Sequence, residues 1–122
     1  MSDVLYETTN KPGHKGWRRR YPRYRTDIPL QAVVLRDDGY VELRGRCSDI
    51  GEGGLGAVLT DDLLPGEVVS LQFAVPEQGE PLTVRAIVRY RKGLVHGFEF
   101  LGLSSDQRQA VKNLCQGLKP LD

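Results

Sequence analysis

Hydrophobic and polar residues alternate along most of the chain with a period of two, the pattern of a half-buried β-strand. The alternation is clearest from Val69 to Val75 and from Leu82 to Tyr90, where every second residue is apolar. Apolar runs bounded by turn residues predict four further strands. The six predicted strands cover residues 28–36, 40–47, 55–60, 69–75, 82–90 and 94–101.

The connections between these strands are short, as at residues 37–39 and 92–93. Strands joined by short turns pair antiparallel, because a parallel pair needs a long crossover. After the last strand the apolar residues recur at helical spacing, and Ser104 with Gln107 forms a capping box that starts a helix. The predicted fold is therefore mainly β: a six-stranded antiparallel β-barrel with a C-terminal α-helix. The apolar face of that helix either closes the barrel or joins two copies of the chain.

A length of 122 residues indicates one domain. Residues 1–17 are polar, with proline and glycine and no apolar period, which predicts a flexible N-terminal segment. Residues 18–118 form the predicted barrel and helix, and residues 119–122 a tail. We expect no membrane insertion, because no apolar run is long enough, and no secretory signal precedes the barrel. The two cysteines are too few for a disulfide framework, which favours a cytoplasmic protein.

Charge is distributed unevenly along the chain. Residues 11–25 carry seven Lys and Arg and no acid, interleaved with Trp17, Tyr21 and Tyr24. The rest of the chain has ten bases against sixteen acids, a net charge of −6. A basic, aromatic segment on an acidic body predicts one place that attracts a negatively charged partner, although a solvated tail has the same composition. Five of the seven bases are Arg, which presents a planar fork to phosphate oxygens or to a guanine edge.

Two segments carry candidate chemistry. The first holds Arg19 and Arg23, four residues apart, and Pro22 between them rules out a regular helix. We therefore expect an extended arm that lies across the barrel. The second is residues 49–56, Asp-Ile-Gly-Glu-Gly-Gly-Leu-Gly, which holds four of the 14 glycines. Such a density of glycine predicts either a tight connection between strands or backbone that approaches another group closely.

In this order, on a six-stranded frame, the two segments resemble the PilZ domain, a bacterial receptor module for cyclic di-GMP. The resemblance covers residues 18–117 and includes the strand order, the Gly-Phe-Glu-Phe stretch at residues 97–100 and the closing helix. It implies that the dinucleotide binds at the outer surface of the barrel and that the arginine arm folds over it. The positions that match the family's ligand-binding pattern are Arg18, Arg19, Arg23, Asp49, Gly51 and Gly54.

The chemistry of these residue types agrees with the resemblance. Arg19 and Arg23 match the family arginine pair, and arginine bonds bidentately to guanine, stacks on bases and pairs with phosphates. Asp49 matches the family Asp or Asn, whose oxygens accept hydrogen bonds from guanine N1–H and N2–H. Gly54 matches a glycine where the backbone passes close to the ligand. Arg18 is an additional arginine, which in the family is compatible with a stacked pair of ligand molecules.

One position departs from the family pattern, because Gly51 stands where the family has Ser. The missing hydroxyl removes one hydrogen bond, worth about 0.5–1.5 kcal/mol. A bridging water or the Gly51 N–H would take over part of its role, and the substitution Gly51→Ser is expected to strengthen binding.

The sequence thus predicts a cytoplasmic receptor or adaptor for cyclic di-GMP, in which ligand reorders the arm and a protein partner reads the change. A degenerate PilZ-like interaction module that does not bind the nucleotide is the alternative, and Gly51 favours it. A barrel that binds single-stranded nucleic acid through Arg and aromatic residues is disfavoured, because the acidic remainder repels a long polyanion. We therefore expect neither DNA nor RNA as partner.

No catalytic or metal-binding constellation can be assembled from the sequence. His14 lies in the predicted flexible segment, and His96 in the last strand is expected to be an ordinary strand residue. Arg85, Arg89 and Arg91 are expected on one solvated face, opposite acidic residues. We expect no enzyme activity, no metal and no cofactor.

Overall fold

The computed structural model describes residues 21–75 and 79–121. In this part of the chain, seven strands and one helix follow one another along the sequence. They are β2 (Tyr24–Arg36), β3 (Gly39–Ile50), β4 (Gly54–Leu59), β5 (Val68–Phe73), β6 (Leu82–Lys92), β7 (Val95–Leu101), α1 (Ser105–Gln116) and the two-residue β8 (Lys119–Pro120).

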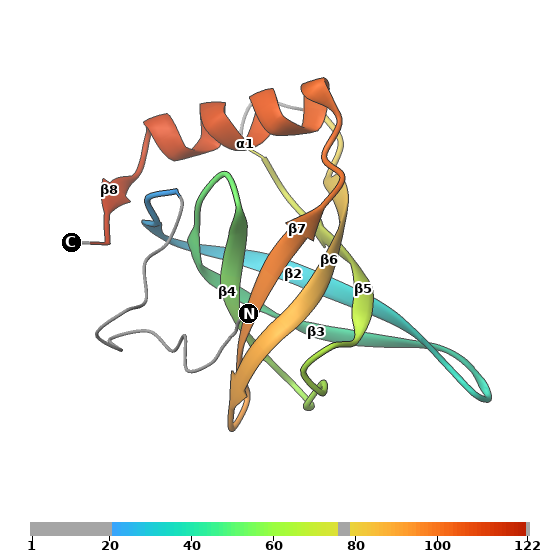
Figure 1. Ribbon diagram of the computed structural model, residues 1–122. Coiled ribbons are helices and arrows are strands. Elements are labelled where there is room, and N and C mark those ends of the chain that lie inside the picture. The colour runs from blue at the N-terminus through green and yellow to red at the C-terminus, as the bar shows by residue number, and fades with distance from the viewer. Residues whose placement is uncertain (1–20, 76–78, 122) are drawn as a thin grey trace.

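Six of the strands close into an antiparallel barrel in the order β3-β4-β7-β6-β5-β2, with β2 pairing back onto β3 (Figure 1). The predicted mainly β fold with one C-terminal helix is therefore confirmed. Three strands extend further than the sequence predicted: β2 begins at Tyr24, β3 continues to Ile50, and β6 continues to Lys92. As a result, Asp49 lies on a strand and only residues 51–53 form the connection to β4.

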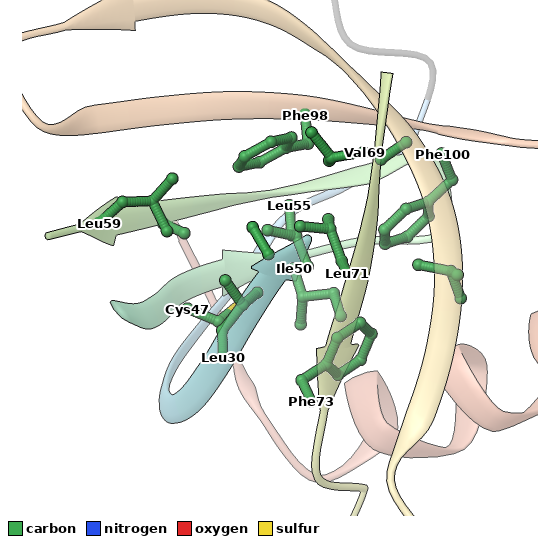
Figure 2. Packing of buried hydrophobic residues seen from close by; sticks show 14 of the residues in the cluster. Leu30, Cys47, Ile50, Leu55, Leu59, Val69, Leu71, Phe73, Phe98 and Phe100 are labelled. Carbon is green, nitrogen blue, oxygen red and sulfur yellow. The ribbon is translucent and has the colours of Figure 1, made fainter. Parts of the chain in front are cut away.

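The interior of the barrel is filled by the apolar residues that the period-two pattern placed there (Figure 2). The alternating residues of β5 and β6 are at most 5% exposed, from Val69 to Val75 and from Val84 to Val88. The helix α1 lies across one end of the barrel and buries Val111 and Leu114 against this core, which Leu118 also contacts. The apolar face of the helix therefore closes the barrel.

Three β-bulges interrupt the pairing, between Arg25 and Ile28, between Cys47 and Asp49, and between Val88 and Tyr90. A bulge inserts one residue and turns the following side chain to the other face of the sheet. Without these insertions, Asp49 would share the inner face with Cys47, and Tyr90 the inner face with Val88. The prediction that Tyr90 points inward with the rest of its strand is therefore wrong.

The C-terminal residues 119–121, which the sequence assigned to a tail, bond to the backbone of β2 and of the arm. Lys119 pairs with Arg25, and Pro120 with Tyr24, so that β8 extends the edge of β2. The Leu121 N–H then donates to the carbonyl oxygen of Arg23 at 2.9 Å. The end of the chain thus holds the backbone of the arm at Arg23.

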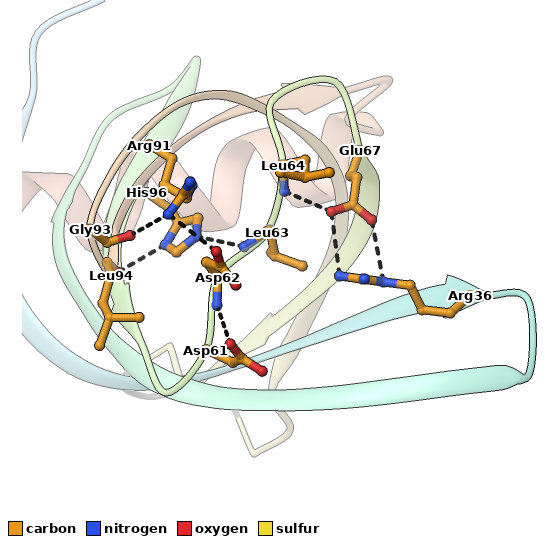
Figure 3. Close-up of polar contacts among 10 residues, drawn as sticks. All are labelled: Arg36, Asp61, Asp62, Leu63, Leu64, Glu67, Arg91, Gly93, Leu94 and His96. Atoms are coloured by element: carbon orange, nitrogen blue, oxygen red, sulfur yellow. Dashed lines mark hydrogen bonds and ion pairs between the residues drawn. The ribbon is translucent and has the colours of Figure 1, made fainter.

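The opposite end of the barrel is closed by the connection between β4 and β5. Leu63 inserts its fully buried side chain, and its N–H donates to Nε2 of His96 at 2.9 Å. Nδ1 of the same ring lies 2.8 Å from the carbonyl oxygen of Leu94, so Nδ1 carries the proton (Figure 3). His96 is the buried polar residue of the described core and acts as a structural bridge between β7 and this connection.

Among residues 21–75 and 79–121, no helix is long and apolar enough to cross a membrane. The same part of the chain contains no group of three or more His, Cys, Asp or Glu side chains placed to hold a metal ion.

Candidate functional site

An ion pair joins the two segments that the sequence singled out. Nη1 of Arg23 donates to Oδ1 of Asp49 at 2.7 Å, and the two side chains are only 14% and 17% exposed. Arg23 comes from the arm before β2, whereas Asp49 is turned outward by the bulge in β3. The pair thus connects residues 26 positions apart at a partly shielded place on the barrel surface, where charge-assisted bonds are stronger than in water.

The arm lies directly on the glycines of the connection between β3 and β4. The ring of Tyr21 covers Gly53, since a Cβ built there would be 2.9 Å from the ring. The carbonyl of Pro22 lies against Gly51. At Gly54 a Cβ would meet the carbonyl of Phe98 and come within 3.2 Å of the Arg23 guanidinium. The three successive arm residues 21–23 can therefore lie this close to the connection only because glycine occupies positions 51, 53 and 54.

The connection itself is a tight turn. The Gly51 N–H donates to the carbonyl oxygen of Gly54 at 2.9 Å, and Phe100 N–H donates to the carbonyl of Gly53 at the same distance. The Gly51 N–H is therefore already used inside the turn. It does not replace the missing hydroxyl in the way that the sequence suggested.

One row of paired residues runs across the outer face beside this turn. In order across the strands it contains Lys119, Arg25, Asp49, Gly56, Gly97 and Tyr90.

The two glycines of this row are buried beneath a carboxylate and an aromatic ring. A Cβ on Gly56 would be 2.6 Å from Oδ2 of Asp49, and a Cβ on Gly97 would overlap the ring of Tyr90. Both flanking side chains therefore lean over the glycines. The row offers cations at one end, a carboxylate acceptor and an aromatic face, which is a chemistry suited to a nucleotide.

The two cysteines support the end of β3 from beneath. Sγ of Cys47 donates to the carbonyl of Asp49 at 3.3 Å, and Sγ of Cys115, from α1, donates to the carbonyl of Ile50 at 3.7 Å. Burial, together with the nearby Asp49 carboxylate, raises the pKa of Cys47 to about 12. Burial raises the pKa of Cys115 to about 11. Both thiols are therefore neutral structural donors.

The structure brings four of the six predicted site residues into one corner of the barrel: Arg23, Asp49, Gly51 and Gly54. Arg18 and Arg19 lie outside the described residues. Sequence reasoning missed Arg25, Tyr90 and Lys119, which share the outer row. Alternation placed Tyr90 inside, and nothing in the sequence announces the bulge that turns it out.

The basic stripe predicted on β6 is divided by the same bulge. Arg89 pairs with Glu99 at 2.6 Å on the outer face, as expected of a solvated strand. Arg91 is instead paired in register with His96 and reaches Asp62 at 3.2 Å at the end of the barrel (Figure 3).

A protein-family comparison matches residues 18–117 to the PilZ domain. The sequence finds no match among curated proteins.

Solved structures share the fold. The PilZ domain of YcgR from Escherichia coli, solved with c-di-GMP, has a TM-score of 0.68 and 23% sequence identity, over 83% of this chain and 91% of that one. The Bacillus subtilis inhibitor of motility MotI/DgrA has a TM-score of 0.65 and 24% identity over 82% of this chain, which spans only 50% of that protein's chain. The PilZ domain of CeSA from a cellulose-synthesizing bacterium has a TM-score of 0.60 and 21% sequence identity, over 78% of this chain and 95% of that one.

Proposed function

The chain belongs to the PilZ domain family, and from this premise we propose that it is a receptor for cyclic di-GMP that signals to a protein partner. One observation carries the proposal: Arg23 of the arm and Asp49 of the barrel meet in a shielded ion pair, with the arm seated on the loop glycines. Both matched motifs thus belong to a single place on the surface.

The ligand offers two guanines and two phosphates, and the site has a partner for each. Asp49 is the acceptor for guanine N1–H and N2–H, a donor pair that adenine lacks. Arg23 supplies a planar guanidinium for a guanine edge, a base face or a phosphate. We assign the same roles to Arg18 and Arg19 from their positions in the family pattern.

The outer row extends this surface. The Tyr90 ring, which covers Gly97, provides a face on which a base can stack, in the same row as the Asp49 carboxylate. Arg25 and Lys119 are exposed and paired in register at the other end, where they attract phosphate.

Ligand binding competes with the Arg23–Asp49 ion pair. When guanine donates to Asp49, the carboxylate loses part of its interaction with Arg23, and the arginine is free to bond to the ligand. Because Pro22 and Tyr21 rest on the loop glycines, a displaced Arg23 moves the arm with it. We infer that this rearranged arm is what a protein partner reads.

The remaining expectations follow from a binding role. We propose a cytoplasmic protein that performs no catalysis, uses no cofactor or metal, and binds neither DNA nor RNA. The net charge of −6 outside residues 11–25 supports a compact anionic ligand over a long polyanion.

Selectivity between nucleotides tests the proposal. In calorimetric titrations we expect saturable binding of cyclic di-GMP and none of cyclic di-AMP at equal concentration. Asp49→Ala, which removes both acceptor oxygens, is expected to weaken binding of cyclic di-GMP at least tenfold. Equal affinity for the two dinucleotides would overturn the assigned role of Asp49.

A second candidate function has its own supporting observation. The Arg23–Asp49 pair is closed, and the family serine is Gly51, with the arm backbone against it. This arrangement suits a PilZ-like module that binds a protein partner and no nucleotide. A folded protein that releases no heat with cyclic di-GMP at millimolar concentration would select this second function.

A further inference from the structure

The β2–β3 and β6–β7 hairpins and the β4–β5 connection lie at the end of the barrel away from α1 (Figure 1). The exposed large apolar residues of the described chain all lie on or next to these segments. Leu64 lies in the connection, Val58 near the end of β4 and Val68 at the start of β5, and the others lie on the two hairpins. The eight residues are Leu35, Tyr40, Val41, Val58, Leu64, Val68, Leu94 and Val95. Single exposed apolar residues are ordinary, whereas a gathering at one end of a molecule marks a contact surface.

The most exposed pair lies on the β2–β3 hairpin, which projects beyond the barrel (Figure 1). Leu35 and Tyr40 face each other across the two strands and are 65% and 75% exposed. Beside them, an open hollow of about 750 Å³ is lined by apolar Leu35 and Val41 and by polar residues. The polar residues of this lining are Arg36, Asp37, Asp38 and Glu67.

The projecting part of β3 is also an open strand edge. β4 pairs with β3 only from Gly45 onward, so no described strand borders residues 39–43 on that side. The turn at residues 37–38 makes Arg36 and Gly39 a hydrogen-bonded pair. Alternation along the strand then directs the backbone N–H and C=O of Tyr40 and Glu42 toward the open side. Such an edge accepts an extended segment as an added strand.

The charges around this edge specify the kind of segment. Arg36 is engaged by Glu67, with its Nε 3.3 Å from Oε1 (Figure 3). Asp37, Asp38 and Glu42 are exposed beside the apolar pair, and no ion pair with a described residue neutralises them. Arg44, the next residue on the same face of β3, is exposed as well, so three acidic side chains stand against one base. The edge is therefore apolar and net acidic, and its complement is apolar and basic.

We propose that the β2–β3 hairpin is a docking edge for an extended, basic segment of a partner protein, which pairs with residues 40–43 and covers Leu35 and Tyr40. The edge lies at the far end of the barrel from Arg23 and Asp49. The proposal therefore goes beyond nucleotide binding and does not depend on it.

A synthetic eight-residue peptide of alternating lysine and valine is the probe, titrated into ¹⁵N-labelled full-length protein. We expect amide shifts confined to residues 35–43, with slowed hydrogen exchange at Tyr40 and Glu42. The same peptide N-methylated at alternate backbone nitrogens keeps its charge but cannot pair as a strand, and it is expected to bind at least tenfold more weakly. A peptide of alternating glutamate and valine is expected not to bind.

Variants complete the test. Leu35→Thr combined with Tyr40→Thr keeps β-forming residues and is expected to weaken peptide binding at least tenfold. Ile87→Thr, which changes a half-buried apolar residue of β6 away from the hairpin, is the matched control and is expected to leave it unchanged. Shifts spread over other acidic positions, or equal binding of the methylated peptide, would overturn the proposal.

Sedimentation of the unlabelled protein distinguishes a second copy from a partner protein. Self-association that Tyr40→Thr abolishes would assign the edge to a second copy of the chain and overturn the partner assignment. Adding cyclic di-GMP to the same labelled sample reads the nucleotide site separately, because its shifts are expected near Arg23 and Asp49. Either site can then fail while the other is retained.

Discussion

The carbonyl group of Pro22 lies where a side chain on Gly51 would begin. A Cβ built on Gly51 would overlap the Pro22 carbonyl oxygen and sit 3.1 Å from Cδ of Arg23. Glycine at this position is therefore part of how the arm is seated. This geometry opposes the expectation from the sequence that Gly51→Ser strengthens binding, because the added Cβ must first displace the arm.

We expect Gly51→Ala and Gly51→Ser to destabilise the protein equally, by about 1–3 kcal/mol, because the added Cβ displaces the backbone of the arm. Urea unfolding measures the change. Gly79→Ala is the matched control, since a Cβ at Gly79 meets nothing within 4 Å. The opposite result would be a Gly51→Ser variant that is as stable as the parent protein and binds cyclic di-GMP more tightly than Gly51→Ala. It would show that the serine hydroxyl adds a hydrogen bond to the ligand.

The shielding of the Arg23–Asp49 pair predicts a strong energetic coupling. A double-mutant cycle with Arg23→Ala and Asp49→Ala is expected to give about 1–3 kcal/mol, because each single substitution leaves a partly buried charge without its partner. The Arg89–Glu99 pair, 57% and 51% exposed, provides an internal comparison with an expected coupling of about 0–1 kcal/mol. Equal coupling energies for the two ion pairs would show that burial does not strengthen the Arg23–Asp49 pair.

Much of the fold followed from the sequence because its pattern is local. Alternation identified the strands, the capping box placed the start of α1, and both were confirmed. The bulges before Asp49 and Tyr90 were not predicted, since an inserted residue leaves no signature in an otherwise regular alternation. Asp49, predicted in the connection after the strand, and Tyr90, predicted on the inner face, therefore share an outer face.

The site was predicted in part for a similar reason. The glycine-rich segment signalled a close approach, but the sequence did not say that the approaching group is the arm itself. The pairing of Lys119 with Arg25 depends on how α1 directs the chain back toward β2, which is a property of the assembled fold. Long-range pairing of a two-residue strand has no local sequence signal.

Substitution of His96 tests the bridge at the closed end of the barrel. His96→Leu removes the acceptor of the Leu63 N–H and the donor to the Leu94 carbonyl, and leaves both backbone groups unpaired. We expect a loss of about 1–3 kcal/mol in the free energy of unfolding, with the affinity for cyclic di-GMP unchanged. Val95→Ala, at the exposed neighbouring position, controls for the strand. Unaltered stability in His96→Leu would contradict the bridging role.

Because the two thiols are buried, we expect them to react slowly with thiol reagents and the protein to lose stability at alkaline pH. With pKa values raised to about 12 for Cys47 and about 11 for Cys115, both stay protonated at pH 8 and are expected to react with Ellman's reagent only after unfolding. Because the folded pKa exceeds the ordinary 9.0, the stabilising contribution is present below pH 9 and is lost as pH rises toward 11–12. Rapid labelling of the native protein at pH 8 would refute this.

Calorimetric titration with cyclic di-GMP, comparing the parent protein with Arg23→Ala and Arg46→Ala, tests the central claim most directly. Arg46 is an exposed arginine of β3 that pairs with Asp27 outside the site, so its loss controls for a change in charge. We expect saturable binding by the parent protein and by Arg46→Ala, and no measurable binding by Arg23→Ala. Binding that survives in Arg23→Ala, or that is absent from the folded parent protein, would contradict the account.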